Sequence, residues 1–210
     1  MITIYHLNNS RSERIIWLME ELGLPYEIEN VTREPSGRAP LSFRDVHPLG
    51  KGPIMRDGDT VIPESGAIIE YIIHRYGNGR LAVPPDSPDY AHYLEWMHAA
   101  EGTAMLQLLA QWRLNRMGTD AGSPIAQAQQ ENTNNLLKYM ADEIGKRPYW
   151  AGEEFTAADI MMMFVLRFLQ HWANIDVSAY PSFAAYRQRI EARPAFQRAM
   201  AIANPKAASA

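Results

Sequence analysis

Small polar residues in the segment Leu7–Ser12 (LNNSRS) could bind an anion. They stand between a β-prone stretch and an amphipathic helix, where the first backbone N–H groups of a helix lack partners and point outward. Such a corner can hold an anion or donate hydrogen bonds to it. Simple N-capping of the helix by Asn9 or Ser10 would explain the same residues structurally.

A second candidate is the segment His47–Pro53 (HPLGKGP). A proline directly before a strand can be cis, and the peptide before it would then expose a backbone N–H and C=O in a surface groove. Lys51 stands beside it as a point charge for a carboxylate. The structural alternative is a plain glycine and proline turn with a solvated lysine.

The third candidate is Pro63–Gly66 (PESG). We expect Ser65 to cap the following helix, and its hydroxyl and the first helical N–H groups could bind a carboxylate. Glu64 could take an ammonium group. A capping serine beside an exposed acid is again the structural alternative. Together, the three segments suit a short peptide with an amine and a carboxylate at one end and a carboxylate at the other.

Alternating and helical patterns predict the elements that would bring these segments together. Apolar residues at i, i+3, i+4 and i+7 predict a helix over Ile15–Leu22, and a second helix starts near Ser65. The first strand, helix and second strand form a parallel unit, and two further strands form a hairpin joined to the second helix. A four-stranded mixed sheet follows. The expected strands are Met1–Leu7, Tyr26–Val31, Pro53–Arg56 and Thr60–Ile62. A short helix is expected at Leu41–Val46.

The segment Ala82–Pro88 (AVPPDSP) reads as an interdomain linker, because its three prolines cannot continue a helix. The chain after it is helical. Thr156 and Asp159 have the spacing of a helix N-terminal capping box, and the apolar helix that follows should be central and buried. The expected domains are therefore 1–81, a linker at 82–88 and an all-helical domain at 89–210.

Composition restricts the function further. The 210 residues include 20 Lys and Arg against 24 Asp and Glu, so no basic excess favours nucleic acid or an anionic membrane. The absence of cysteine excludes disulfides, thiolate zinc sites and a cysteine nucleophile, and it suits reducing cytoplasm. The six histidines do not cluster at metal-ligand spacing, so we expect no metal. No signal peptide or membrane-spanning run is apparent.

The three segments and the domain order resemble the cytosolic glutathione transferases, and the resemblance covers nearly the whole chain. Its most specific parts look like a bacterial and fungal branch with a serine-type active site. The family implies an α/β thioredoxin-like first domain (β-α-β-α-β-β-α) and an all-α second domain. The parts that carry the resemblance are Ser10–Arg14, Trp17–Leu22, His47–Ile54, Pro63–Ser65 and Phe155–Ile160.

The resemblance also implies roles for individual residues. Ser10 falls where serine-type members hydrogen-bond the glutathione sulfur, with Tyr5 and Asn9 as alternatives and Asn8 as a further donor. Pro53 would be the cis proline, and Gly52 would pair with the cysteinyl backbone, although most relatives have a bulkier residue there. The remaining implied glutathione contacts are Lys51 to the glycyl carboxylate, and Glu64 and Ser65 to the γ-glutamyl group.

The implied activity is attack of an activated glutathione thiol on small hydrophobic electrophiles, as in detoxification. Met105, Leu109 and Trp112 are candidates for the electrophile pocket, although their helical spacing also suits a core stripe. Relatives form homodimers, and we expect one here. A glutathione-dependent peroxidase or reductase, and a non-catalytic ligand- or partner-binding protein of the same fold, are the alternatives.

Overall fold

The computed structural model describes residues 1–173 and 175–205. Contacts between residues divide the chain into two compact units, Met1–Ala82 with Glu191 onward, and Val83–Ile190. The boundaries at 81 and 89 that we expect from the sequence remain a prediction. The contact grouping differs from them at the C-terminal end, where the last helix goes with the first unit.

The first unit is built on a four-stranded mixed sheet, as predicted. The strand order is β2-β1-β3-β4, with β1 parallel to β2 and β3 antiparallel to both β1 and β4. The parallel pair is joined through a crossover helix and the antiparallel pair by a tight turn, as such pairs require. The strands are β1 Ile2–Leu7, β2 Tyr26–Val31, β3 Ile54–Asp57 and β4 Thr60–Pro63.

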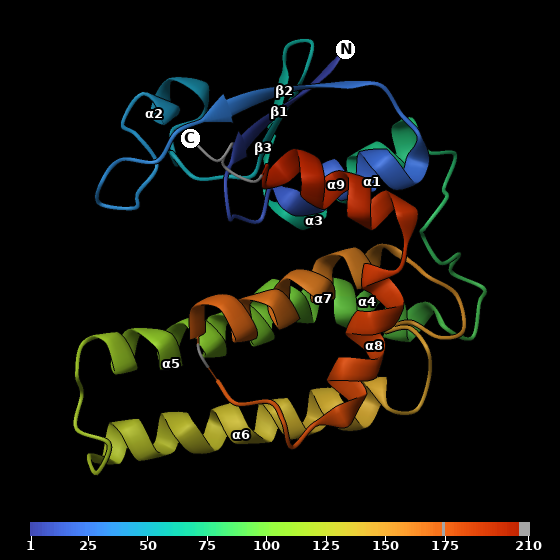
Figure 1. Cartoon of the computed structure of the whole chain (residues 1–210). Coiled ribbons are helices and arrows are strands. Elements are labelled where there is room, and N and C mark those ends of the chain that lie inside the picture. The colour runs from blue at the N-terminus through green and yellow to red at the C-terminus, as the bar shows by residue number, and fades with distance from the viewer. Residues whose placement is uncertain (174, 206–210) are drawn as a thin grey trace. The chain divides into compact units, whose positions relative to one another are not determined.

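Helices α1, α3 and α9 lie together beside this sheet, while α2 is a single short turn (Figure 1). Helix α1 buries its apolar stripe and ends at Gly23, which adopts φ 66° and donates its N–H to the Met19 carbonyl. Glycine adopts this left-handed conformation without a Cβ clash. The helices of the unit are α1 Glu13–Leu22, α2 Phe43–Val46, α3 Ser65–Arg75 and α9 Pro194–Ala203.

Helix α9 packs along α1, although nearly the whole chain separates them in sequence. The ring of Phe196 meets that of Trp17 edge to face, with centroids 4.9 Å apart. Arg198 Nε lies 2.8 Å from Glu20 Oε2 at the exposed side of the same contact. The first unit therefore takes its third covering helix from the far end of the chain.

The second unit is helical, as expected, and α7 is its buried centre. Every residue of α7 except Arg167 is buried, and α7 packs against α4, while α5 and α6 pack against each other (Figure 1). Two short π-helical turns, η1 and η2, interrupt the helices. The elements are α4 Tyr90–Ala99, η1 Ala100–Met105, α5 Leu106–Arg116, α6 Pro124–Ile144, α7 Ala157–Phe168, η2 Leu169–Ala173 and α8 Pro181–Glu191.

The predicted capping box at the start of α7 is confirmed. Asp159 accepts hydrogen bonds from the Thr156 backbone N–H (2.8 Å), the Trp150 backbone N–H (3.0 Å) and the Tyr186 hydroxyl (3.1 Å). Complete burial raises the pKa of Asp159 to about 6 despite these donors. The carboxyl thus joins three segments of the helical unit. Within the described ranges, no helix is both long enough and apolar enough to cross a bilayer.

Candidate functional site

Ser10 lies in the loop between β1 and α1, half-buried at the edge of the first unit. Its Oγ is 2.8 Å from Ser12 Oγ and accepts the Ser12 backbone N–H at 3.3 Å. The N-cap residue of α1 is Ser12, and its side chain makes no capping bond. The alternative in which Asn9 or Ser10 caps the helix is therefore wrong, because the helix begins further along, at Glu13.

Arg33, which follows β2, holds this loop in place. Its guanidinium donates to the carbonyls of Asn8 (Nε, 3.0 Å), Asn9 (Nη2, 3.1 Å) and Gly37 (Nη1, 2.8 Å). Burial lowers the pKa of Arg33. Sequence analysis missed this residue, because a single cation within the polar segment 32–40 gives no local sign that it ties two loops together.

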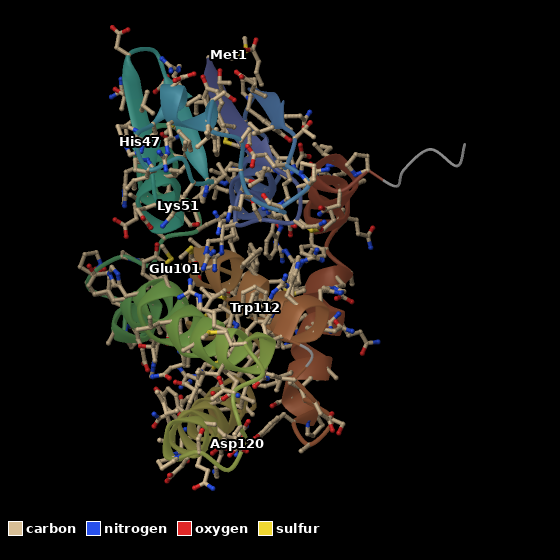
Figure 2. All side chains as sticks on the ribbon, turned by 90° about the vertical axis from the view of Figure 1, so that its left-hand side faces the viewer. Met1, His47, Lys51, Glu101, Trp112 and Asp120 are labelled. Atoms are coloured by element: carbon tan, nitrogen blue, oxygen red, sulfur yellow. The ribbon has the colours of Figure 1, made fainter. Side chains whose placement is uncertain are left out.

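A pocket of about 650 Å³ opens beside Ser10 and is rich in positive charge. Its walls come from the β1–α1 loop, the segment after β2 and the segment before β3, where Figure 2 labels Lys51 and His47. Glu34 is the one acidic residue in its lining. An anionic ligand in this pocket would meet basic and small residues. These are Ser10, Arg11, Arg33, Arg38, Arg44, Lys51 and Gly52.

The Gly52–Pro53 peptide bond is cis, as expected for a proline directly before a strand. Gly52 lies close to Ser10: a Cβ built on Gly52 would be 3.8 Å from Ser10 Oγ and 3.8 Å from the Phe43 ring. These are ordinary van der Waals distances, so a Cβ at this position would fit without displacing Ser10 or Phe43. Two of the three predicted segments thus meet at one pocket.

The third segment, Glu64 and Ser65, differs in detail from the expectation. Helix α3 begins at Ser65, whose side chain does not cap it, so the predicted capping role is wrong. The physical reason is that the Ser65 hydroxyl, 2% exposed, accepts a hydrogen bond from Nη1 of the buried Arg14 at 3.2 Å. Glu64 has φ 75°, a conformation that costs a non-glycine residue energy and often marks a functional turn.

Tyr5, the alternative to Ser10, is a buried residue of β1. Its ring packs in a cluster with Phe43 and Ile54, and its hydroxyl accepts a hydrogen bond from Arg56 Nε at 3.1 Å. This partner gives the Tyr5 hydroxyl a structural role. Asn9, the other alternative, is exposed at φ 54° and donates its backbone N–H to Asn204 Oδ1 at 3.3 Å.

His6 and Ser12 are buried polar residues directly behind Ser10. Sequence analysis included Ser12 in the segment Leu7–Ser12 without a role of its own, and it missed His6. Ser12 Oγ lies 2.7 Å from His6 Nδ1, and His6 Nε2 lies 2.7 Å from the carbonyl oxygen of Ala203. Burial lowers the pKa of His6. A signal did exist: alternation places His6 on the same strand face as Ile2 and Ile4, where a polar side chain must find buried partners.

The candidates for the electrophile pocket belong to the helical unit. Met105 is 1% exposed at the end of η1, which fits the core role that sequence analysis left open for these residues. Leu109 and Trp112 are half-buried on α5, and the Arg116 guanidinium carbon lies 5.3 Å from the centre of the Trp112 ring, which Figure 2 labels. Their role in binding an electrophile remains a prediction.

Comparisons with known proteins agree with this arrangement. Family models described as glutathione S-transferase N-terminal and C-terminal domains match residues 10–75 and 104–194. Glutathione S-transferase 3 of Schizosaccharomyces pombe is 31% identical over 207 residues, covering 93% of this chain and 85% of that protein.

Solved structures of glutathione transferases are also similar to this chain. A crystal structure of a glutathione S-transferase from Actinobacillus pleuropneumoniae has a TM-score of 0.87 and 30% identity, over 97% of this chain and 93% of that one. A glutathione transferase family member from Pseudomonas fluorescens, solved with two glutathione bound, has a TM-score of 0.80 at 23% identity, over 95% and 92%. The first two of these relatives match at 30% identity or more over most of their length. The chain therefore belongs to the glutathione S-transferase family of enzymes.

Proposed function

We propose that the pocket beside Ser10 binds glutathione and activates its thiol as a thiolate, which then attacks a small hydrophobic electrophile. The observation that carries this proposal is the meeting of Ser10, Lys51 and Gly52 at one cationic pocket. Glutathione carries a glycyl carboxylate, and the basic lining suits it. The known relatives named glutathione S-transferases support the same ligand.

Each predicted contact has a chemical reason. Lys51 offers a charge to the glycyl carboxylate, and the backbone of Gly52 offers hydrogen bonds to the cysteinyl residue. The Ser65 hydroxyl already accepts from Arg14, so its own proton is available to a γ-glutamyl carboxylate. Glu64, exposed beside it, suits the γ-glutamyl ammonium.

Activation of the thiol requires preferential stabilisation of the anion. A free thiol has a pKa of about 8.5, and lowering it by about two units takes about 2.7 kcal/mol. A hydrogen bond from Ser10, the N-terminus of α1 and the cationic lining all favour the thiolate. For the electrophile we propose contacts with Leu109 and Trp112, with the buried Met105 as support. We also propose that the enzyme acts in detoxification as a homodimer.

Calorimetric titration with glutathione, followed by a conjugation assay with a chloronitrobenzene on the same preparation, tests the proposal. Binding together with turnover is the expected result. Binding without turnover would contradict conjugation of this electrophile and favour another reaction of glutathione, such as peroxide reduction. Absence of binding would overturn the proposal as a whole.

A further inference from the structure

A continuous chain of hydrogen bonds runs from Ser10, at the pocket, to the end of helix α9. Ser10 Oγ is 2.8 Å from Ser12 Oγ, and Ser12 Oγ is 2.7 Å from His6 Nδ1. His6 Nε2 is 2.7 Å from the carbonyl oxygen of Ala203. Ser12 and His6 are both fully buried, so water does not replace either partner.

The direction of each bond in this chain follows from the chemistry of the atoms. A carbonyl oxygen can only accept, so His6 Nε2 must carry a proton, and Nδ1 of a neutral imidazole must then accept. Ser12 therefore donates its single hydroxyl proton to His6 Nδ1 at 2.7 Å, in preference to the Leu7 carbonyl oxygen at 3.4 Å. The Leu7 backbone N–H already donates to Ser12 Oγ at 3.3 Å. Ser10 must therefore be the donor in its hydrogen bond with Ser12. The Ser10 hydroxyl then offers the pocket a lone pair and no proton.

This direction conflicts with donation from Ser10 to a thiolate, and the conflict is resolved if the chain reverses. We propose that His6 accepts, through Ser12 and Ser10, the proton that the glutathione thiol loses; this inference rests on the proposed function. The thiol S–H bond breaks and its proton passes to Ser10 Oγ. The Ser10 proton moves to Ser12 Oγ, and the Ser12 proton forms the new N–H bond at His6 Nδ1.

After the transfer, every bond in the chain points toward the sulfur. The imidazolium donates to Ser12, Ser12 donates to Ser10, and Ser10 donates to the thiolate. The sulfur keeps the electron pair of the broken bond, and after conjugation the proton returns along the same chain to the leaving group or to water in the pocket. Ser12 and His6 act through Ser10 and are therefore positioning residues.

The surroundings of His6 suit both of its protonation states. Burial and the charge of Arg33, after β2, lower its pKa, which favours neutral His6 in the free protein. Ala203 is the last residue of α9, and a helix C-terminus stabilises a cation. On α1, Glu13 contacts Asn204, the residue after Ala203. The β2 partner of His6 is the uncharged Asn30.

Nitrogen NMR of the imidazole of His6 in the full chain tests the proposal, with His6→Gln used to assign the signal. We expect a neutral Nε2–H imidazole in the free protein and with S-methylglutathione, which has no thiol proton, and an imidazolium with glutathione. Calorimetry and the ultraviolet absorbance of the thiolate are measured on the same samples. Neutral His6 alongside bound thiolate would overturn this inference alone, whereas absence of glutathione binding would overturn the proposed function and this inference together.

The kinetics of two variants test the same proton path. Two variants are used so that the test does not depend on either one of them folding. Ser12→Ala keeps His6 and its contact with α9, while His6→Gln keeps hydrogen-bonding groups but cannot take the proton. We expect each variant to shift the pH profile of kcat/KM alkaline by about one unit, and the double variant to shift it no further. His74→Gln, on the exposed side of α3, is the matched control and should leave the profile unchanged. An unshifted profile in Ser12→Ala would overturn the proposal.

Discussion

Arg193 and Glu21, 172 positions apart, form a two-point ion pair between the start of α9 and the end of α1. Arg193 Nε lies 2.8 Å from Oε1 of Glu21, and Nη2 lies 2.8 Å from Oε2. The Glu21 side chain is only 9% exposed and that of Arg193 is 27% exposed. The paired geometry fixes both the distance and the orientation of α9 on α1.

Arg193→Lys should destabilise the first unit by about 1 kcal/mol, because an ammonium cannot form the parallel pair of hydrogen bonds. Urea unfolding measures the change. Arg198→Lys is the matched control on the same helix: its pair with Glu20 is more exposed, so the expected loss is close to zero. Equal losses from the two substitutions would show that the paired geometry contributes nothing beyond charge.

Ser10→Ala should reduce kcat/KM by about 10- to 100-fold at pH values below the pKa of the bound thiol, the size of one lost charge-assisted hydrogen bond. The pH–rate profile should move alkaline, while the affinity for glutathione measured by calorimetry stays nearly constant. Tyr5→Phe is the control, because the Tyr5 hydroxyl is bonded to Arg56 and its loss should leave the profile in place. A shift with Tyr5→Phe and none with Ser10→Ala would exchange their assigned roles.

Ser65→Ala should weaken glutathione binding by about tenfold, since the hydroxyl proposed to hold the γ-glutamyl carboxylate is removed. Calorimetry measures the affinity, and thermal unfolding reports any cost of removing the acceptor of the Arg14 bond. Ser42→Ala, at an exposed serine that makes no capping bond, should change neither quantity. Wild-type affinity in a folded Ser65→Ala protein would argue against the γ-glutamyl contact.

Arg33→Gln should loosen the loop before Ser10, because three hydrogen bonds to backbone carbonyls are lost together. We expect faster amide hydrogen exchange over residues 8–10 and 34–38, and kcat/KM lower by about tenfold. Arg38→Gln removes the same charge from the same pocket but should leave the exchange rates near those of the wild type. Equal amide hydrogen exchange rates in the two variants would show that Arg33 contributes only its charge and does not hold the loop.

The raised pKa of Asp159, about 6, makes the stability of the helical unit depend on pH. Between the unfolded pKa of about 4 and the folded value, the folded carboxyl binds more protons than the unfolded one, so stability falls as pH rises through this window. The change should be about 2–3 kcal/mol. The free energy of unfolding of the wild type and of Asp159→Asn, measured at both ends of this pH window, isolates the contribution of Asp159. A difference between the two proteins that stays constant with pH would contradict the prediction.

The order of strands and helices could be predicted because burial of one face leaves a local periodic pattern. The stripe on Ile15–Leu22 is of this kind. The parallel pair of β1 and β2 follows from the helix that connects them, and the capping box at Thr156 follows from the spacing of two polar residues. The cis bond at Gly52–Pro53 was also foreseeable, since only proline tolerates it at ordinary frequency. The helices and strands that carry the candidate site were therefore largely predicted correctly.

Specific partners could not be predicted, because they depend on where distant segments pack. Arg14 bonds Ser65 from 51 residues away, and this contact removes Ser65 from its expected capping role. Likewise, no pattern near His6 indicates that its partner is the carbonyl of Ala203. Local patterns constrain which face is buried, whereas the identity of a buried hydrogen-bond partner is settled only in three dimensions.

The bond between His6 and Ala203 has a consequence for the order of events at the ribosome. The two residues are 197 positions apart, so β1 leaves the exit tunnel long before the segment that completes its surroundings has been translated. Until then, the face of α1 that carries Trp17 has no Phe196 to cover it. A nascent chain that stalls before α9 would display this apolar face to chaperones and proteases, and its Ser10 site would still lack the carbonyl that His6 contacts.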